Sequence, residues 1–195
     1  QQMKKKILQI LFILFFFAPA NSEIKINPIY EGSIDAKIEL IIYESLTCGH
    51  CASFHKNVYP QLKKNFIDKG LIKIEFRSFP FDIAGLNAAK IAHCRNNNNS
   101  DILHFLFKNQ KKWAKGDSVE EVNSNLINLL KDNKVDLDFN QCINDKSIED
   151  HILEDRIEAM KKFDINATPT LIINGKKFDK SLNYKNIKKA LEKLI

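Results

Sequence analysis

Two cysteines separated by two residues, Cys48 and Cys51, lie where a strand-like segment gives way to a helix-like one. Residues 38–43 are an almost continuous run of Ile, Leu and Tyr, which is typical of a buried β-strand. Apolar residues then recur every four positions from Phe54 to Phe66, the spacing of a helix with one buried face. The sequence therefore predicts a tight strand-to-helix connection with the cysteine pair at the start of the helix.

This position predicts reactive chemistry for Cys48. The first backbone N–H groups of a helix have no partner within the helix, and together with the helix dipole they stabilise an anion there. The thiolate is the reactive form of cysteine. Cys51 lies one helical turn further on, close enough to form a disulfide with Cys48. We therefore predict a dithiol/disulfide redox centre that needs no further cofactor.

A Cys-x-x-Cys pair can also be half of a zinc site, but such sites need a second closely spaced pair of ligands. The other two cysteines, Cys94 and Cys142, lie far from each other and from the first pair. The competing ligand set would be Cys48, Cys51 and His55 with one distant residue. We favour the redox centre and expect no metal.

The first twenty residues carry the pattern of a secretory signal peptide. Lys4–Lys6 precede an apolar stretch over 7–18, and Ala18-Pro19-Ala20 supplies small residues at the positions that cleavage requires. The apolar stretch is shorter than the ~20 residues that span a bilayer. We expect cleavage near Ala20 and a periplasmic mature protein, where disulfides persist. A retained membrane anchor is the alternative.

The formal net charge of +6 gives no support for nucleic-acid binding. Half of this charge comes from the three lysines within residues 1–20, and the remaining lysines are scattered over helix-like segments. Such scatter is typical of solvent-exposed helix faces rather than of a patch that contacts phosphates. We expect no nucleic-acid partner.

The segments around the cysteine pair predict a sheet covered by helices. Residues 71–77 form a second strand-like segment, and two strands joined by a helical crossover pair in parallel. An earlier edge strand is expected near 24–26. The helix over 51–68 should bend at Pro60, because proline lacks the N–H that a helix interior requires.

The second half of the chain predicts a helical block and then a return to the sheet. Apolar residues keep helical spacing throughout 81–163. Strand signals return at 170–173 and 176–178, joined by the hairpin dipeptide Asn174-Gly175. A final helix over 184–194 should bury Ile187, Leu191 and Leu194. We expect an α/β domain over 21–80 and 164–195, interrupted by an inserted helical domain over 81–163.

Several motifs resemble those of the DsbA family of exported bacterial thiol oxidases, particularly its alphaproteobacterial branch. They are Ser45-Leu46-Thr47-Cys48-Gly49-His50-Cys51-Ala52-Ser53-Phe54-His55, Phe76-Arg77-Ser78-Phe79-Pro80, and Ala167-Thr168-Pro169-Thr170 with Asn174-Gly175. The resemblance covers essentially the whole chain beyond the predicted signal peptide. It implies a thioredoxin fold with an inserted helical domain.

The resemblance also implies a function. The protein would introduce disulfide bonds into exported proteins by thiol–disulfide exchange at Cys48 and Cys51, with Gly49 and His50 between them tuning the chemistry. Thr168–Pro169 would form a cis peptide bond, and its loop would offer backbone groups to an extended client segment. A quinone-linked membrane partner of the DsbB type would reoxidise the protein, which we expect to be a monomer.

Two positions depart from the common pattern of this family. Gly49 stands where many members have proline, and Gly-His is the dipeptide of protein disulfide isomerases, which are milder oxidants than DsbA. The buried carboxylate that the family places near the base of the first strand corresponds to Ile42 here. Glu44 has the same side-chain parity and could substitute, but we expect it to be a surface charge.

Cys94 and Cys142 both fall in the helical block, and in an oxidising compartment we expect them to pair with each other. A second redox centre or two free thiols are the alternatives. We expect the remaining histidines to be surface or packing residues rather than ligands; they are His55, His93, His104 and His151.

Other functions remain open at this point. An isomerase or reductase could use the same cysteine pair if the pair were kept reduced. A substrate-binding or chaperone-like module whose cysteines hold zinc is the alternative from another class of protein.

Overall fold

The computed structural model describes residues 25–195, so the predicted signal peptide over 1–20 lies outside the described residues. The expected edge strand near 24–26 is wrong in position. Residues 25–28 are irregular, and the first strand is β1 at Ile29–Gly32. Among the described residues, no helix combines the length and apolar character that a membrane crossing requires.

A five-stranded mixed sheet forms the centre of the molecule, with strand order β1-β3-β2-β4-β5. Strands β2 (Ile38–Glu44) and β3 (Ile72–Ser78) are parallel, as the helical crossover between them predicts. Strand β1 pairs with β3 in antiparallel register, and β4 (Thr170–Ile173) pairs with β2 in the same sense. The Asn174-Gly175 turn leads into the short β5 (Lys176–Lys177).

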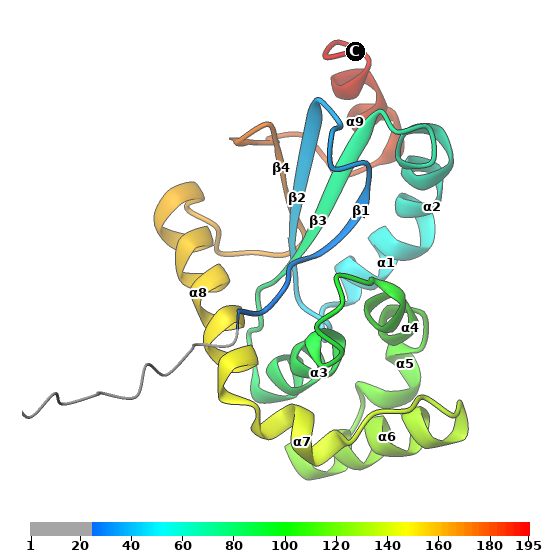
Figure 1. Ribbon diagram of the computed structural model, residues 1–195, viewed down its shortest axis with the longest axis vertical. Coiled ribbons are helices and arrows are strands. Elements are labelled where there is room, and N and C mark those ends of the chain that lie inside the picture. The colour runs from blue at the N-terminus through cyan, green and yellow to red at the C-terminus, as the bar shows by residue number, and fades with distance from the viewer. Residues whose placement is uncertain (1–24) are drawn as a thin grey trace, which may run out of the picture.

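Both faces of the sheet are buried at strand β2. Successive side chains of a strand point to opposite faces, so the burial of neighbouring residues reports on both faces. Leu40 and Ile42 are completely buried in the main core, whereas Tyr43 is completely buried in a second cluster on the other face. In Figure 1, α1, α2 and α9 cover one side of the sheet and α8 covers the other. A continuous apolar run in the sequence is therefore what this central strand requires.

The helix after the cysteine pair is interrupted near Pro60. Helix α1 (Gly49–Asn57) stops before Val58, α2 (Tyr59–Leu62) restarts with Pro60 in its first turn, and one π-helical turn, η1 (Lys63–Ile67), follows. Proline is compatible with a first turn because the N–H that it lacks has no helical partner there. The predicted bend thus becomes a break between two helices.

Six helices occupy the segment between β3 and β4. They are α3 (Ile83–His93), α4 (Asp101–Lys108), α5 (Gln110–Trp113), α6 (Val119–Asp132), α7 (Phe139–Asn144) and α8 (Lys146–Phe163). Helices α3 to α7 gather at the end of the sheet where β2 leads into α1, and α8 runs back along the sheet (Figure 1). The division of the chain into two domains stays a prediction.

Cys94 and Cys142 form a disulfide with a Cα–Cα distance of 5.4 Å, which joins the end of α3 to α7. At the other end of the chain, α9 (Tyr184–Leu191) buries Ile187 and Leu191 against the main core. The prediction for Leu194 is wrong: it lies beyond α9 and its side chain is 48 % exposed.

Candidate active site

Cys48 is the N-terminal capping residue of α1, at the end of the connection from β2. Its backbone is extended, with φ −79° and ψ 119°, and its N–H donates to the Ser45 carbonyl at 3.0 Å. Its thiol is partly exposed, and the Cys48–Cys51 pair is in the dithiol form. The sulfur therefore lies where the free N–H groups of a helix start can reach it.

These contacts make Cys48 acidic. The Cys51 thiol donates to the Cys48 sulfur, and the backbone N–H groups of Cys51 and His50 also favour the thiolate. Partial burial opposes ionisation but is the weaker influence. The pKa of Cys48 falls from an ordinary value of 9.0 to about 5. At neutral pH Cys48 is thus a thiolate, which is both a nucleophile and a good leaving group.

Cys51 has the opposite character. Its side chain is completely buried in the main core. Burial raises the pKa of Cys51 far above its usual range, and the nearby Cys48 and the charge of Glu44 act in the same direction. Cys51 therefore remains a thiol when the pair is reduced.

The peptide bond between Thr168 and Pro169 is cis, and this loop lies against the cysteine pair. The Cys48 sulfur is 3.5 Å from the Thr168 carbonyl oxygen, although 120 residues separate the two. Strand β4 begins at the next position, Thr170, so the loop is anchored to the sheet. The structure thus brings Cys48, Cys51, Thr168 and Pro169 together.

Gly49 and His50 occupy the exposed first turn of α1. A Cβ atom at Gly49 would meet no other atom within 4 Å, so nothing in the fold requires glycine there. His50 contributes its backbone N–H to the environment of Cys48. A role for the imidazole of His50 stays a prediction.

The expectation that Glu44 is a surface charge is wrong. Glu44 is the last residue of β2 and shares the parity of the buried Leu40 and Ile42, so its side chain points into the main core and is only 3 % exposed. Glu44 Oε2 is 2.7 Å from Nε2 of His55, whose side chain is also buried. The second carboxylate oxygen, Oε1, has no hydrogen-bond partner. Two signals could have revealed this contact: the parity of Glu44, and the placement of His55 one turn after Cys51 on the same helix face.

Gln110 is a second residue that the sequence analysis missed. It is 8 % exposed, and its side-chain amide donates to the carbonyl oxygens of Leu46 at 2.7 Å and Cys48 at 3.0 Å. It reaches them from α5, so the helical block fixes the backbone on both sides of Thr47. No local pattern could predict this contact, because more than sixty residues separate the partners.

Asp82 and Gly85 form a further connection between the helical block and the active-site loop. The Thr47 hydroxyl donates to Asp82 at 2.9 Å, while Asp82 caps α3 by accepting from the Gly85 N–H at 2.6 Å. A Cβ atom at Gly85 would lie 3.0 Å from the Thr47 hydroxyl oxygen, so glycine permits the close approach.

The described residues contain no group of three or more His, Cys, Asp or Glu side chains arranged to hold a metal ion. His55, the third residue of the competing zinc set, turns its two ring nitrogens to Glu44 and His104. The described part of the chain thus offers zinc no ligand set at the cysteine pair.

A family model described as Thioredoxin matches residues 25–193. The sheet order, the cysteine pair at the start of α1 and the cis-proline loop beside it define a thioredoxin-like protein with a dithiol site.

Comparison with solved structures and sequences narrows this class. The crystal structure of alpha-DsbA1 from Wolbachia pipientis superposes with a TM-score of 0.77 at 33 % identity, over 86 % of this chain and 90 % of that one. Disulfide bond formation protein D of Bacillus subtilis is 27 % identical over 175 residues, 83 % of this chain and 74 % of that protein. The chain therefore belongs to the DsbA-like branch of the thioredoxin family.

Similar sequences named protein-disulfide oxidoreductase also occur in Rickettsia. The Rickettsia bellii protein is 27 % identical and the Rickettsia prowazekii protein 28 % identical, each over 171 residues and 87 % of this chain. This chain spans about two thirds or less of those proteins, at 65 % and 62 % of their lengths.

Proposed function

We propose that the protein is a thiol oxidase that transfers the Cys48–Cys51 disulfide to client proteins. The observation that carries this proposal is the opposite character of the two thiols: Cys48 is partly exposed with a pKa of about 5, and Cys51 is buried with a raised pKa. A reduced pair stabilised as a thiolate favours release of the disulfide to a substrate. The names of the Rickettsia and Bacillus relatives support the same chemistry.

The reaction proceeds by two exchanges. A client thiolate attacks the Cys48 sulfur, the Cys48–Cys51 bond breaks, and Cys51 leaves and takes up a proton. A second client thiolate then attacks the client sulfur of the mixed disulfide, and Cys48 leaves as a thiolate. The client loses two electrons and gains a disulfide, while the protein gains the two electrons and becomes the dithiol.

Glu44 is suited to supply the proton that Cys51 needs. Cys51 leaves in a completely buried site, where an unpaired thiolate is costly. Glu44 lies close enough for its charge to raise the pKa of Cys51, and its Oε1 atom has no partner. We therefore assign Glu44 as the group that exchanges a proton with Cys51.

The loop at Thr168 and Pro169 is suited to hold the client. An extended client segment can pair with the backbone there, which is independent of client sequence. Two exposed apolar side chains, Phe81 at 51 % and Ile83 at 57 %, flank Asp82, which contacts the active-site loop through Thr47. Such side chains suit clients that are not yet folded.

The clients and the partner follow from the predicted signal peptide and the family. We propose that the clients are reduced exported proteins in the periplasm, and that a DsbB-type quinone-linked membrane protein restores the disulfide. We further propose that the protein acts as a monomer.

Equilibration with glutathione tests the oxidase assignment. We expect a reduction potential between those of protein disulfide isomerase and DsbA, about −180 to −120 mV. A potential near that of thioredoxin, about −270 mV, would contradict the assignment and favour a reductase.

A client assay distinguishes oxidation from isomerisation. The oxidised protein should form disulfides in a reduced unfolded client at one bond per molecule, and Cys48→Ala should form none. The second reaction to measure is the recovery of a client with scrambled disulfides by the reduced protein. If this recovery is faster than the oxidation of a reduced client by the oxidised protein, an isomerase is favoured.

A further inference from the structure

A chain of hydrogen bonds leads from Glu44 to the surface of the molecule. Glu44 Oε2 is 2.7 Å from His55 Nε2, His55 Nδ1 is 3.1 Å from His104 Nδ1, and His104 Nε2 is 2.6 Å from Glu31 Oε1. These four residues come from β2, α1, α4 and β1, so they are brought together only by the fold. The attack on the Cys48 sulfur does not itself require His55, His104 or Glu31.

Aromatic rings enclose the two imidazoles. The His55 ring stacks on Phe107 with a centroid distance of 4.0 Å, and the His104 ring stacks on Tyr59 at 4.3 Å. Phe76 packs against both imidazoles, at 5.8 and 5.2 Å. The rings hold both imidazoles in place, and direct hydrogen bonds join the His55 ring to Glu44 on one side and to His104 on the other.

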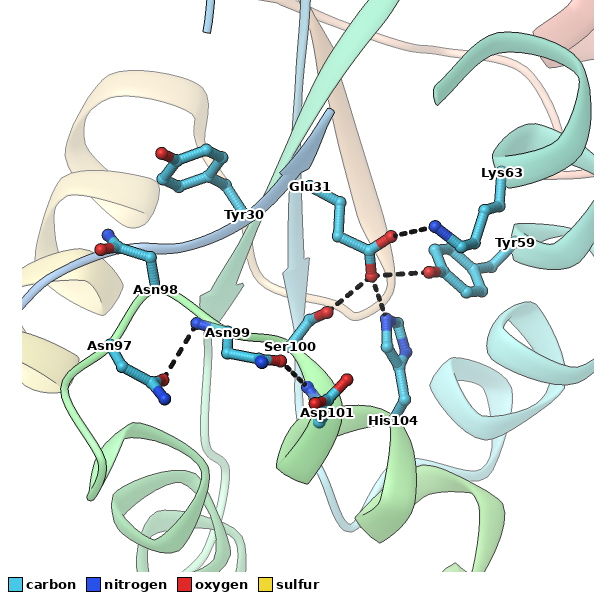
Figure 2. A pocket seen from close by; sticks show the side chains of 10 residues that line it. All are labelled: Tyr30, Glu31, Tyr59, Lys63, Asn97, Asn98, Asn99, Ser100, Asp101 and His104. Carbon is cyan, nitrogen blue, oxygen red and sulfur yellow. Dashed lines mark hydrogen bonds and ion pairs between the residues drawn. The ribbon is translucent and has the colours of Figure 1, made fainter. Parts of the chain in front are cut away.

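The outer end of the chain opens to solvent. Glu31 lines a surface pocket of about 480 Å³ together with Tyr59, Lys63 and His104 (Figure 2). It accepts from the hydroxyls of Tyr59 and Ser100, each at 2.6 Å, and from Lys63 at 3.0 Å. Despite partial burial, these bonds and the bond from His104 hold the pKa of Glu31 well below its usual range. Glu31 is thus a fixed negative charge.

The three bonds of the chain require three protons. Two neutral imidazoles supply two, and ionised Glu44 and Glu31 supply none, so the chain carries one further proton. That proton can lie on Glu44, on His55 or on His104, and a hop within each hydrogen bond moves it from one to the next. The ionised Glu31 attracts the proton toward His104, while the Cys51 thiolate that forms when the disulfide opens attracts it toward Glu44.

We propose that His55 and His104 form a proton relay between Glu44 and the Glu31 pocket, which rests on the proposed oxidase function and on Glu44 as the proton donor. When Cys51 leaves the disulfide, Glu44 gives it a proton as His55 Nε2 gives one to Glu44 and His104 Nδ1 gives one to His55 Nδ1. His104 starts with both ring nitrogens protonated and ends neutral, with Nε2–H still donating to the ionised Glu31, so one proton moves from the pocket end of the chain to Cys51. Reoxidation runs the same steps in reverse.

Chemical rescue of a relay variant tests this proposal. The readout is the single-turnover rate at which a dithiol peptide reduces the oxidised protein at neutral pH. His104→Ala should slow this step by about tenfold or more, which is less than the ~10²-fold lower end of direct general acid–base effects because His104 acts through two other groups. Imidazole should restore much of the rate, because the deleted ring opens a space next to the pocket. Pyrazole, a ring of the same size and a far weaker base, should not.

Two further variants complete the test. His151→Ala is the matched control, because its side chain has the same 24 % exposure as His104 but lies outside the chain of hydrogen bonds, packing against the His93 ring and near Asp155, and its rate should equal that of the unmodified protein. His104→Gln fills the space and keeps hydrogen-bonding groups, so it should fold normally and remain slow with either ring.

Three results would overturn the relay: an unchanged rate in both His104 variants, a slow His104→Ala that imidazole does not accelerate, or equal acceleration by pyrazole. Each leaves the oxidase function intact. An unmodified protein that cannot oxidise the peptide at all would instead refute the proposed function, and the relay with it.

Discussion

Two chemically identical thiols behave differently in this protein because of where each side chain lies. Cys48 receives hydrogen bonds from Cys51 and from the start of α1, and these lower its pKa to about 5. Cys51 is completely buried near the carboxylate of Glu44, and burial together with that charge raises its pKa. On this basis we assign Cys48 as the sulfur that clients attack and Cys51 as the thiol that leaves when the disulfide opens.

Replacing the inner thiol should stop the reaction halfway. We expect Cys51→Ala to retain the reactive Cys48 thiolate and to accumulate mixed disulfides with client proteins, visible as adducts on a non-reducing gel after incubation with client disulfides. Cys48→Ala, the matched control, should form almost none because the remaining thiol is buried. Equal trapping by both variants would contradict the division of roles.

The acidity of Cys48 should also make the stability of the reduced protein depend on pH. The pKa of Cys48 is about 5 in the folded protein against an ordinary value of 9.0, so the unfolded chain binds more protons between these values. The resulting stabilisation is fully present above about pH 9 and is lost as the pH falls toward 5. Urea unfolding measures this as the difference in the free energy of unfolding between the reduced protein and Cys48→Ala, which should shrink as the pH falls from about 9 to 5. A difference that stays constant with pH would contradict the lowered pKa of Cys48.

Helices far along the chain hold the active-site loop in place. Gln110 of α5 donates to the Leu46 and Cys48 carbonyls, and Asp82 before α3 accepts from Thr47. The loop that carries Cys48 is therefore fixed between the sheet and the helical block.

Removal of the Gln110 amide should destabilise this loop. Gln110→Ala leaves the Leu46 carbonyl without that donor, and we expect a loss of about 1–3 kcal/mol in the free energy of unfolding. Gln141→Ala, on an exposed position of α7, is the control and should change stability by less than about 0.5 kcal/mol. Similar losses in both variants would show that the amide contacts contribute nothing specific.

The disulfide between α3 and α7 should matter for stability and not for exchange. It closes a separation of 48 residues, for which the chain-entropy relation gives an upper estimate of about 4 kcal/mol. We expect the Cys94→Ala/Cys142→Ala variant to unfold at lower denaturant concentration while oxidising clients at an unchanged rate. A folded double variant without exchange activity would contradict this assignment.

Local sequence patterns were sufficient for the elements that carry the site. The apolar run before Cys48 and the four-residue spacing after it predict β2 and α1, because both depend on short-range periodicity. Glu44 was misjudged because its position at the end of the strand, next to a loop, was given more weight than its parity with Leu40 and Ile42 and the placement of His55. Gln110 and the His104 contact were missed for the same reason: their partners are distant in sequence.

At the scale of the whole molecule, the thioredoxin-like part supplies the cysteine pair at the start of α1 and the cis-proline loop before β4. Helices α3 to α7 lie at the end of the sheet where β2 leads into α1 (Figure 1). On one side of the site the Cys48 sulfur lies against Thr168, where we propose that clients bind, and on the buried side hydrogen bonds lead from Glu44 toward the pocket at Glu31. Thiol–disulfide exchange at Cys48 and the proton transfer that we propose for Cys51 thus take place on different sides of the cysteine pair.

The ionisation of Cys48 is the property on which the whole account depends. The direct measurement is the pH dependence of the alkylation rate of Cys48 in the reduced Cys51→Ala variant and in the unaltered dithiol protein. In the unaltered protein we expect a midpoint near pH 5, and a higher midpoint in the variant because the Cys51 thiol no longer donates to the sulfur. A midpoint near 8.5 in the unaltered protein, the value of free cysteine, would contradict the account.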